Sequence, residues 1–248
     1  MQSYARTDIG KLRAHNQDYI YSSSDAIGTL KNLFVVADGM GGHKAGDYAS
    51  RFAVEELTFY VEHSATSPVI PMLKKGIEGV NRRLYSRSLN SEDLSGMGTT
   101  LVIATVEDTT LYVANVGDSR LYLFRDQALI QITRDHSYVE EMVSLGKLER
   151  NSKEYLEKKN IITRAIGADT NVDIDFFDLV LQEQDLILLC SDGLTNMLDD
   201  YEMTQILLQK GTLEEKTEQL IQNANQNGGR DNISVILIEP RVSEVIPC

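Results

Sequence analysis

The sequence TLVIATVEDTTLYVANVGDSRLYLF, residues 100–124, contains three apolar segments that are separated by two short polar links. The segments 100–106, 111–116 and 121–124 are rich in Val, Leu and Tyr, which is typical of β-strands. The links 107–109 and 117–119 are too short for a crossover between parallel strands. We therefore expect three consecutive strands that pair antiparallel with their neighbours.

Further strands and two pairs of helices are predicted around this region. Apolar segments of strand length recur at 33–37, 176–181, 186–190 and 233–238. Apolar stripes with helical spacing over 46–63 and 73–84 predict one pair of helices. A second pair is predicted over 201–210, opened by Asp199 with Glu202, and 213–224, preceded by a capping box of Thr212 and Glu215. Strand blocks that alternate with helix pairs indicate an α+β fold with helices layered on antiparallel sheet.

The composition excludes several functional classes. The 248 residues include 24 Lys and Arg against 37 Asp and Glu, which gives a formal net charge of −13. Nucleic acid and anionic membranes require a basic face, so neither is an expected partner, whereas a metal cation is. Cys190 and Cys248 are the only cysteines, which argues against a disulfide framework and for a cytoplasmic location. No apolar run approaches the roughly 18 residues of a membrane span.

The chain shows no linker and no internal repeat. We therefore expect a single domain over residues 1–241, followed by a C-terminal tail at 242–248. Residues 140–159 are crowded with charges of both signs and poor in apolar residues. This segment, within residues 136–166, is expected to form an exposed flap.

Four aspartates stand at the ends of predicted strands. Asp38 follows 33–37, Asp192 follows 186–190, Asp118 lies in the link after 111–116, and Asp231 with Asn232 precedes 233–238. An Asp-Gly pair after a strand is also a common turn, and this alternative stays open for each position taken singly. If the strand ends coincide, each close pair of carboxylates repels by roughly 4 kcal/mol unless cations lie between them. Oxygen ligands favour Mg²⁺ or Mn²⁺, and two such ions can bind a phosphoryl group and activate water.

A phosphate in such a site also needs a guanidinium group. Arg13 lies five residues before Asp18, so in an extended segment their side chains point to opposite sides. A bend is therefore required if both face one site. Taken singly, Arg13 is typical of a surface residue and Asp18 of a loop or capping acid.

Seven short motifs, in this order, resemble the metal-dependent Ser/Thr protein phosphatases of the PP2C (PPM) family, in particular its compact bacterial members. The motifs are RAHNQD (13–18), VADGMGG (36–42), GMGTT (96–100), ANVGDSR (114–120), DHS (135–137), SDGL (191–194) and GRDNIS (229–234). The resemblance implies a central β-sandwich of two antiparallel sheets flanked by helix pairs. This agrees with the alternating blocks of strands and helices.

The resemblance also implies a catalytic centre made of Asp38, Asp192 and Asp231. Asp38 is implied to bridge two metal ions, with the Gly39 carbonyl on one of them. Asp192 and Asp231 are the implied ligands of the other ion. The implied cofactors are two Mn²⁺ or Mg²⁺ ions.

Further site residues follow from the same resemblance. Asp18 resembles the acid that holds metal-bound water, and Asp118 with Asp192 resembles a third, weaker metal site. Arg13 resembles the arginine that pairs with the substrate phosphate, where bidentate recognition favours Arg over Lys.

Two positions depart from the family pattern. Gln17 stands where many members carry Glu, which shifts the holding of water to Asp18. Met40 stands where eukaryotic relatives carry a proposed general acid, and a thioether cannot donate a proton. His43 and a metal-bound water are the alternative proton sources.

The function implied by the resemblance is hydrolysis of phosphoserine and phosphothreonine monoesters by direct attack of a metal-bridging hydroxide, without a phosphoenzyme. The implied partners are phosphorylated proteins, namely substrates of a cognate Ser/Thr kinase and the kinase itself. Two alternatives stay open: a phosphoprotein-binding module that keeps the fold without catalysis, and a two-metal nuclease. The lack of a basic track argues against the nuclease.

Overall fold

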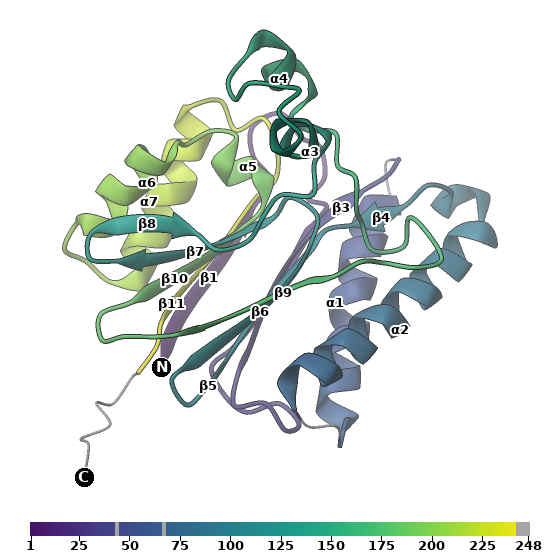
Figure 1. The fold of residues 1–248 in the computed structure, drawn as a ribbon, viewed down its shortest axis with the longest axis horizontal. Coiled ribbons are helices and arrows are strands. Elements are labelled where there is room, and N and C mark those ends of the chain that lie inside the picture. The colour runs from purple at the N-terminus through teal and green to yellow at the C-terminus, as the bar shows by residue number, and fades with distance from the viewer. Residues whose placement is uncertain (43–44, 66–67, 242–248) are drawn as a thin grey trace.

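The computed structural model describes residues 1–42, 45–65 and 68–241, which form two antiparallel β-sheets packed between helices (Figure 1). The first sheet has the strand order β1 (Gln2–Asp8), β11 (Ile233–Glu239), β10 (Leu186–Cys190), β7 (Arg120–Arg125) and β8 (Ala128–Gln131). The second sheet has the order β2 (Asp18–Ser23), β3 (Leu33–Met40), β5 (Leu101–Glu107), β6 (Thr110–Val116) and β9 (Asp175–Val180), and β4 (Gly98–Thr99) pairs with β3. The predicted α+β sandwich of two antiparallel sheets is confirmed. The tail expected at 242–248 and the candidate proton donor His43 lie outside the described residues.

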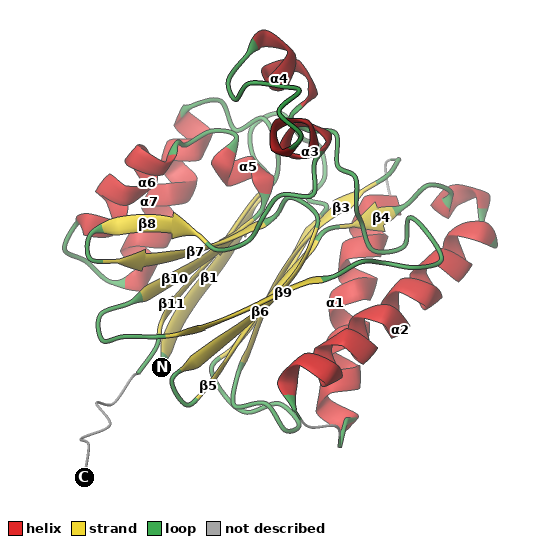
Figure 2. Cartoon of the chain, viewed as in Figure 1, coloured by secondary structure: helices red, strands yellow, loops and turns green. Residues whose placement is uncertain are grey.

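Helices cover the outer face of each sheet (Figure 2). The pair α1 (Ala45–His63) and α2 (Val69–Leu89) packs on the second sheet, and a 3₁₀ turn, η1 (Glu92–Leu94), follows. The helices α5 (Asp192–Thr195), α6 (Asp200–Leu208) and α7 (Leu213–Gln226) pack on the first sheet. Asp199 and Thr212 cap α6 and α7, and each completes a capping box with the Glu three residues later. In the described part of the chain, no helix has the length and hydropathy needed to cross a bilayer.

Strand β3 shows how the layers are held together. Leu33, Val35 and Ala37 pack against the helices, whereas Phe34 and Val36 pack between the two sheets. Both faces of the strand are therefore buried, which explains its unbroken apolar sequence. The side chains of β10 alternate in the same way. Every second one packs against the helices on the first sheet, and the others pack between the two sheets.

The expectation that all three strands of residues 100–124 pair in succession is wrong for the second link. β5 and β6 pair antiparallel, but β6 then pairs with β9, whereas β7 lies in the other sheet between β10 and β8. The link 117–119 crosses from one sheet to the other. Gly117 forms this corner with φ of +107°, and a Cβ there would lie 2.6 Å from Thr100 Cγ2, so glycine is needed. A short link fixes the chain direction but not the sheet that the next strand joins.

Four strands, β1, β2, β4 and β8, have no counterpart in the sequence analysis. β1, β2 and β8 are edge strands of their sheets. None of the residues in β1 or β8 is fully buried, so neither strand carries the apolar pattern that identifies a buried strand.

Residues 136–166 extend beyond one end of the sandwich and contain α3 (Tyr138–Ser144) and α4 (Lys153–Lys158), as Figure 2 shows. Glu140 links the two helices. Its Oε1 accepts hydrogen bonds from Arg150 Nη1 (2.8 Å) and Tyr155 Oη (2.8 Å), and its Oε2 accepts one from Arg150 Nη2 (2.6 Å). This charged segment is therefore organised around a buried and paired carboxylate, which its composition does not reveal.

Candidate active site

The predicted acidic residues meet at the end of the sandwich that lies next to α4. Asp38, Asp118, Asp192 and Asp231 line one cavity of about 270 Å³, and its wall also contains Gly39 and Arg13. Asp18 stands directly opposite Asp38 in the pairing of β2 with β3. The second sheet thus contributes Asp18 and Asp38, and the corner between the sheets contributes Asp118. Asp192 begins α5 just after β10, and Asp231 lies just before β11, so both stand beside the ends of strands of the first sheet.

Backbone contacts fix the Asp38-Gly39 pair at the end of β3. The Asp38 N–H donates to Thr100 Oγ1 (2.9 Å), and the Asp38 carbonyl accepts from the Thr100 N–H (2.8 Å). The Gly39 N–H donates to the Gln17 carbonyl (3.0 Å). A Cβ on Gly39 would lie 2.0 Å from the Gly46 carbonyl oxygen, so no side chain fits there. The backbone that carries the Asp38 carboxylate is therefore rigid.

Asp18 is held by two serines of the opposite sheet. Its Oδ2 accepts hydrogen bonds from Ser191 Oγ and Ser234 Oγ, each at 2.7 Å. Ser191 Oγ also accepts the Ser234 N–H at 3.0 Å. These three buried side chains join β2 to the ends of β10 and β11, so they fix the distance between the two groups of acids.

The bend that the sequence requires between Arg13 and Asp18 is present, and Asn232 maintains it. The Asn232 side chain donates two hydrogen bonds to this segment and accepts one, at 2.8–3.0 Å, with Ile9, His15 and Gln17 as partners. Arg13 Nη2 donates to Asp231 Oδ2 at 2.7 Å. Asp231 therefore orients the guanidinium at the wall of the cavity.

The corner that carries Asp118 is supported by His136. The Gly117 N–H donates to His136 Nδ1 (3.1 Å), and His136 Nε2 lies 3.1 Å from Asp175 Oδ2. Because Nδ1 accepts a hydrogen bond, the proton resides on Nε2 and the ring is neutral. Burial lowers the pKa of His136, which agrees with this neutral form.

The carboxyl groups of the cluster are poorly solvated and repel one another. Burial raises the pKa of Asp38 well above its ordinary range, and the charges of Asp18 and Asp192 raise it further. Burial also raises the pKa of Asp18 to about 7, although its two serine hydrogen bonds act in the opposite direction. The pKa of Asp118 is raised to about 8 by burial and by the charge of Asp192. The cluster is therefore unfavourable as a set of bare carboxylates.

These properties fit a cation site. Asp18 Oδ1 and Asp192 Oδ1 are buried and have no hydrogen-bond partner. Within residues 1–42, 45–65 and 68–241, no three His, Cys, Asp or Glu side chains lie so that they could together hold a metal ion. Bound ions would therefore use a few carboxylate and carbonyl oxygens and complete their shells with water, as hard ions such as Mg²⁺ do.

A second cavity of about 180 Å³ adjoins the first and shares Asp118, Asp192 and Asn160 with it. Its outer wall includes Lys159, the C-cap residue of α4. Burial raises the pKa of Asp192 and the charge of Asp231 raises it further, whereas the Lys159 ammonium acts against both. The flap therefore contributes a positive charge to the edge of the site.

Several residues that position the site were not assigned a role from sequence. Ser234 and Asn232 lie inside the last motif, and Ser191 is the first residue of the motif SDGL (191–194). Asn196, which donates to Asp192 Oδ2 at 2.9 Å, and Lys159 carry no motif signal. The partners of the two serines and of Asn232 are distant in sequence, so spacing alone does not identify them. Asn196 lies only four residues after Asp192, but an Asn at this spacing is no signal by itself.

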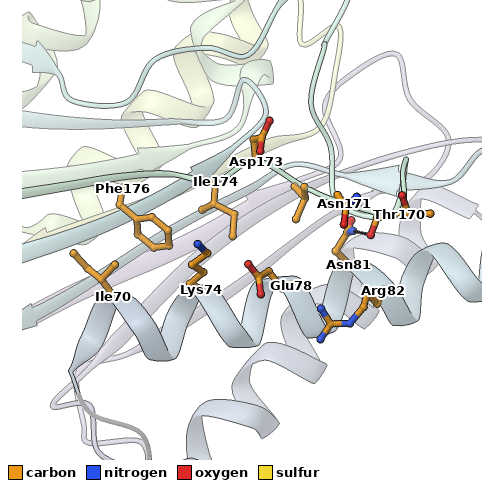
Figure 3. Close-up of a pocket in the computed structure, with 11 residues that line it drawn as sticks. Ile70, Lys74, Glu78, Asn81, Arg82, Thr170, Asn171, Asp173, Ile174 and Phe176 are labelled. Atoms are coloured by element: carbon orange, nitrogen blue, oxygen red, sulfur yellow. Dashed lines mark hydrogen bonds between the residues drawn. The ribbon is translucent and has the colours of Figure 1, made fainter.

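A larger cavity of about 600 Å³ lies between α2 and residues 170–176 (Figure 3). Asn81 in its wall is fully used in holding the neighbouring loop: its Oδ1 accepts from the Gly167 N–H (2.7 Å), and its Nδ2 donates to the carbonyls of Asp169 (3.0 Å) and Thr170 (3.2 Å). The charged side chains in the wall are two cations and two acids: Lys74, Arg82, Glu78 and Asp173. This cavity lacks a concentrated charge of one sign, so the aspartate cluster is the stronger candidate for the active site.

Comparison with known proteins agrees with the fold. Residues 11–237 match the family described as Protein phosphatase 2C. The chain is 42% identical over 245 residues to the serine/threonine phosphatase stp of Listeria monocytogenes serotype 4b, with 96% of each chain covered. The structure of the S. agalactiae serine/threonine phosphatase is 37% identical, with a TM-score of 0.89 and coverage of 95% of this chain and 98% of that one.

A further similar structure is the catalytic domain of the serine/threonine protein phosphatase PstP in complex with two manganese ions. It is 31% identical, with a TM-score of 0.82, and the match covers 95% of this chain and 96% of that one. The match to the family extends over almost the whole chain and includes all seven motifs. The chain therefore belongs to the protein phosphatase 2C family of metal-dependent serine/threonine protein phosphatases.

Proposed function

We propose that this phosphatase hydrolyses phosphoserine and phosphothreonine monoesters of proteins directly, at the cavity lined by Asp38, Asp192 and Asp231. The observation that carries the proposal is the convergence of these carboxylates from both sheets on one 270 Å³ cavity, with a buried oxygen of Asp192 left unpartnered. Such a group of repelling carboxylates is suited to divalent cations.

The residues present would hold two Mn²⁺ or Mg²⁺ ions. Asp38 would lie between the two, with the Gly39 carbonyl on one ion and with Asp192 and Asp231 on the other. When bound, the ions neutralise charge on the phosphoryl oxygens and lower the pKa of the water molecule that attacks phosphorus. Asp18 would orient water at the edge of this group.

A phosphoenzyme is not part of the proposal, because the nearby hydroxyl groups are committed elsewhere. Ser191 Oγ is buried and donates to Asp18. Ser119 Oγ is also buried and is hydrogen-bonded to Thr100 Oγ1 at 2.7 Å. Neither serine lines the 270 Å³ cavity, as a nucleophile that reaches the substrate phosphate would have to.

Arg13 binds the substrate phosphate in this proposal. Its hydrogen bond to Asp231 uses one of the five N–H donors of a guanidinium group, which leaves the others for phosphate oxygens. Met40 also lines the cavity but cannot donate a proton to the leaving oxygen. A water molecule therefore protonates the leaving group unless His43 does so.

The finer features of the proposal concern the flap and the cellular setting. A third, weaker cation would be held by Asp118 and Asp192, beneath the flap at 136–166 of a single catalytic domain, 1–241. The substrates would be phosphorylated proteins of a cognate Ser/Thr kinase, together with that kinase. We place the enzyme in the cytoplasm, where the buried free thiol of Cys190 stays reduced.

Substitution of the central carboxylates tests this proposal. Asp38→Ala and Asp192→Ala should each abolish Mn²⁺-dependent hydrolysis of a phosphothreonine peptide, while circular dichroism shows an intact fold. Asp178→Ala, which removes an exposed acid on β9, serves as the matched control and should retain wild-type turnover. Unchanged turnover in Asp38→Ala or Asp192→Ala would refute the assignment.

A second assay separates the alternatives left by the sequence. Hydrolysis of p-nitrophenyl phosphate with Mn²⁺, abolished by chelator, supports the phosphatase. Binding of a phosphopeptide without hydrolysis would instead indicate a binding module. Metal-dependent cleavage of DNA in place of phosphate release would indicate a nuclease.

A further inference from the structure

Two adjacent lysines at the end of α4 have different surroundings. Lys158 Nζ forms an ion pair with Glu154 Oε1 at 2.8 Å on the exposed surface. Lys159 is half-buried and lines the 180 Å³ cavity together with Asp118 and Asp192. Among the described residues, Lys159 forms no ion pair within 4 Å.

The other cation in the wall of this cavity is not available to these aspartates. Arg120 is bound to Asp135 by three hydrogen bonds of 2.7–3.1 Å, and its remaining amino group donates to Tyr122 Oη at 2.9 Å. Lys159 also acts on the Asp192 carboxyl more strongly than Arg120 does. Of the two cations in this wall, Arg120 is held by hydrogen bonds, whereas Lys159 has no ion pair among the described residues.

A lysine side chain carries its charge on a flexible four-carbon stem, so rotation about that stem moves the ammonium over several ångströms. An ammonium and a divalent cation that share this 180 Å³ space repel each other, and both are attracted to Asp118 and Asp192. Their occupation of the cavity is therefore mutually unfavourable.

We propose that Lys159 competes with the third cation for the Asp118 and Asp192 carboxylates, neutralising them when that cation is absent and withdrawing when it binds. The inference rests on the proposed function, which supplies the third-cation position. Because Lys159 belongs to the end of α4, the competition also couples occupancy of this position to the conformation of the flap. The coupling is reciprocal. A flap conformation in which Lys159 is withdrawn binds the cation more tightly, and the bound cation favours that conformation by the same factor.

Calorimetric titration of the full chain with Mn²⁺ measures this competition without any turnover. Lys159→Gln should tighten the weakest class of Mn²⁺ sites about tenfold, the order expected when one unit charge beside a divalent ion is removed from a partly solvated site. Lys159→Arg keeps the charge and should retain the wild-type affinity. Lys158→Gln removes the same net charge from the exposed side of α4 and should leave the weakest class unchanged.

A double-mutant cycle localises the effect. Asp118→Asn should weaken or abolish the weakest class of sites, and adding Lys159→Gln to Asp118→Asn should then change Mn²⁺ binding by a smaller factor than Lys159→Gln does alone. An undiminished effect of Lys159→Gln in the Asp118→Asn background would overturn the inference, because the lysine would then act elsewhere.

Other outcomes also decide the matter. If Lys159→Gln and Lys158→Gln tighten Mn²⁺ binding equally, the effect is a long-range one of net charge and local competition is overturned. An unchanged Mn²⁺ affinity of the weakest sites in Lys159→Gln would overturn it too. If the wild-type chain binds Mn²⁺ and hydrolyses the phosphothreonine peptide, but Lys159→Gln has the wild-type Mn²⁺ affinity, only this inference fails. If the wild-type chain neither binds Mn²⁺ nor hydrolyses the peptide, the proposed function fails with it.

Discussion

Replacing Ser191 or Ser234 by Ala removes a hydrogen bond that crosses from the first sheet to Asp18 in the second. Both bonds are 2.7 Å long, both end on Asp18 Oδ2, and all three side chains are buried. Asp18 Oδ1 has no hydrogen-bond partner, so the two serines are the side-chain partners of this carboxylate among the described residues. Either substitution therefore leaves a buried acid with a single donor.

The structure predicts unequal costs for the two substitutions. A hydrogen bond to a charged group contributes about 1.5–3 kcal/mol, which Ser234→Ala loses. Ser234→Ala also loses the 2.8 Å hydrogen bond with Thr7 Oγ1, but Thr7 is half-buried, so water can replace that partner at a net cost of about 0.5–1.5 kcal/mol or less. Ser191→Ala loses a bond of the same kind and also removes the acceptor of the buried Ser234 N–H, which adds about 1–3 kcal/mol. Ser191→Ala should therefore destabilise the protein more than Ser234→Ala does.

The loss in free energy of unfolding that each substitution causes, called here the deficit, should also depend on pH. Burial raises the pKa of Asp18 to about 7, and the serine bonds oppose this rise, so their loss raises the pKa of Asp18 further. A folded-state pKa above the unfolded value means that the folded state binds more protons, so stability falls as the pH rises. The deficit of both variants should therefore be larger at about pH 8 than at about pH 5.5.

Urea unfolding with excess chelator, followed by circular dichroism at both pH values, measures these differences. Ser144→Ala is the control, because its exposed hydroxyl donates only to the Glu141 carbonyl, and it should change the unfolding free energy by less than about 0.5 kcal/mol. If Ser191→Ala costs no more than Ser234→Ala, or if both deficits are the same at the two pH values, the serines do not stabilise an ionised Asp18.

Three other results are expected. Arg13→Ala should raise KM more than it lowers kcat if the guanidinium binds ground-state phosphate, and steady-state kinetics that show a loss in kcat alone would instead place its action in the transition state. Gly39→Ala should yield an inactive protein with lowered stability to urea, because its Cβ would lie 2.0 Å from the Gly46 carbonyl oxygen, and a wild-type unfolding curve would contradict that packing. Without metal, stability should fall as the pH rises from about 4 to about 8, because the pKa of Asp118 is raised from 3.8 to about 8, a contribution of at most about 6 kcal/mol by linkage. Saturating Mn²⁺ should reduce this slope in pH-dependent urea unfolding, and an unchanged slope would show that the cation does not engage these carboxylates.

The sequence predicts those parts of the fold in which local pattern and burial coincide. Residues 33–37 form a strand buried on both faces, and their unbroken apolar sequence identifies it. The capping boxes that begin with Asp199 and Thr212 identify the start of two helices because each box is complete within four residues. The link 117–119 is different, because its length permits an antiparallel neighbour in either sheet. Only the packing of β7 against β10 settles which sheet it joins.

The candidate site likewise has parts that the sequence predicts and parts that it does not. Aspartates at strand ends are visible in the sequence, and the family motifs give them expected roles. The supports of the site are not visible, because they join residues far apart: Ser191 is 173 positions from Asp18, and Ser234 is 216 positions from it. Lys159 is hidden for another reason, since its charge is one of many in a segment whose arrangement depends on Glu140.

The burial of the strands explains why the repelling acids stay together. Asp38 and Asp192 extend from β3 and β10, whose alternate side chains, such as Val36 and Leu189, fill the core between the two sheets. The acids can separate only if the sheets move apart, which would expose that core at roughly 25 cal/mol for each Å² of apolar surface. The hydrogen bond from Ser191 to Asp18 also joins the two sheets directly. In the metal-free fold these acids therefore either repel one another or bind protons, as their raised pKa values indicate. A divalent cation that neutralises them removes that cost without moving the sheets.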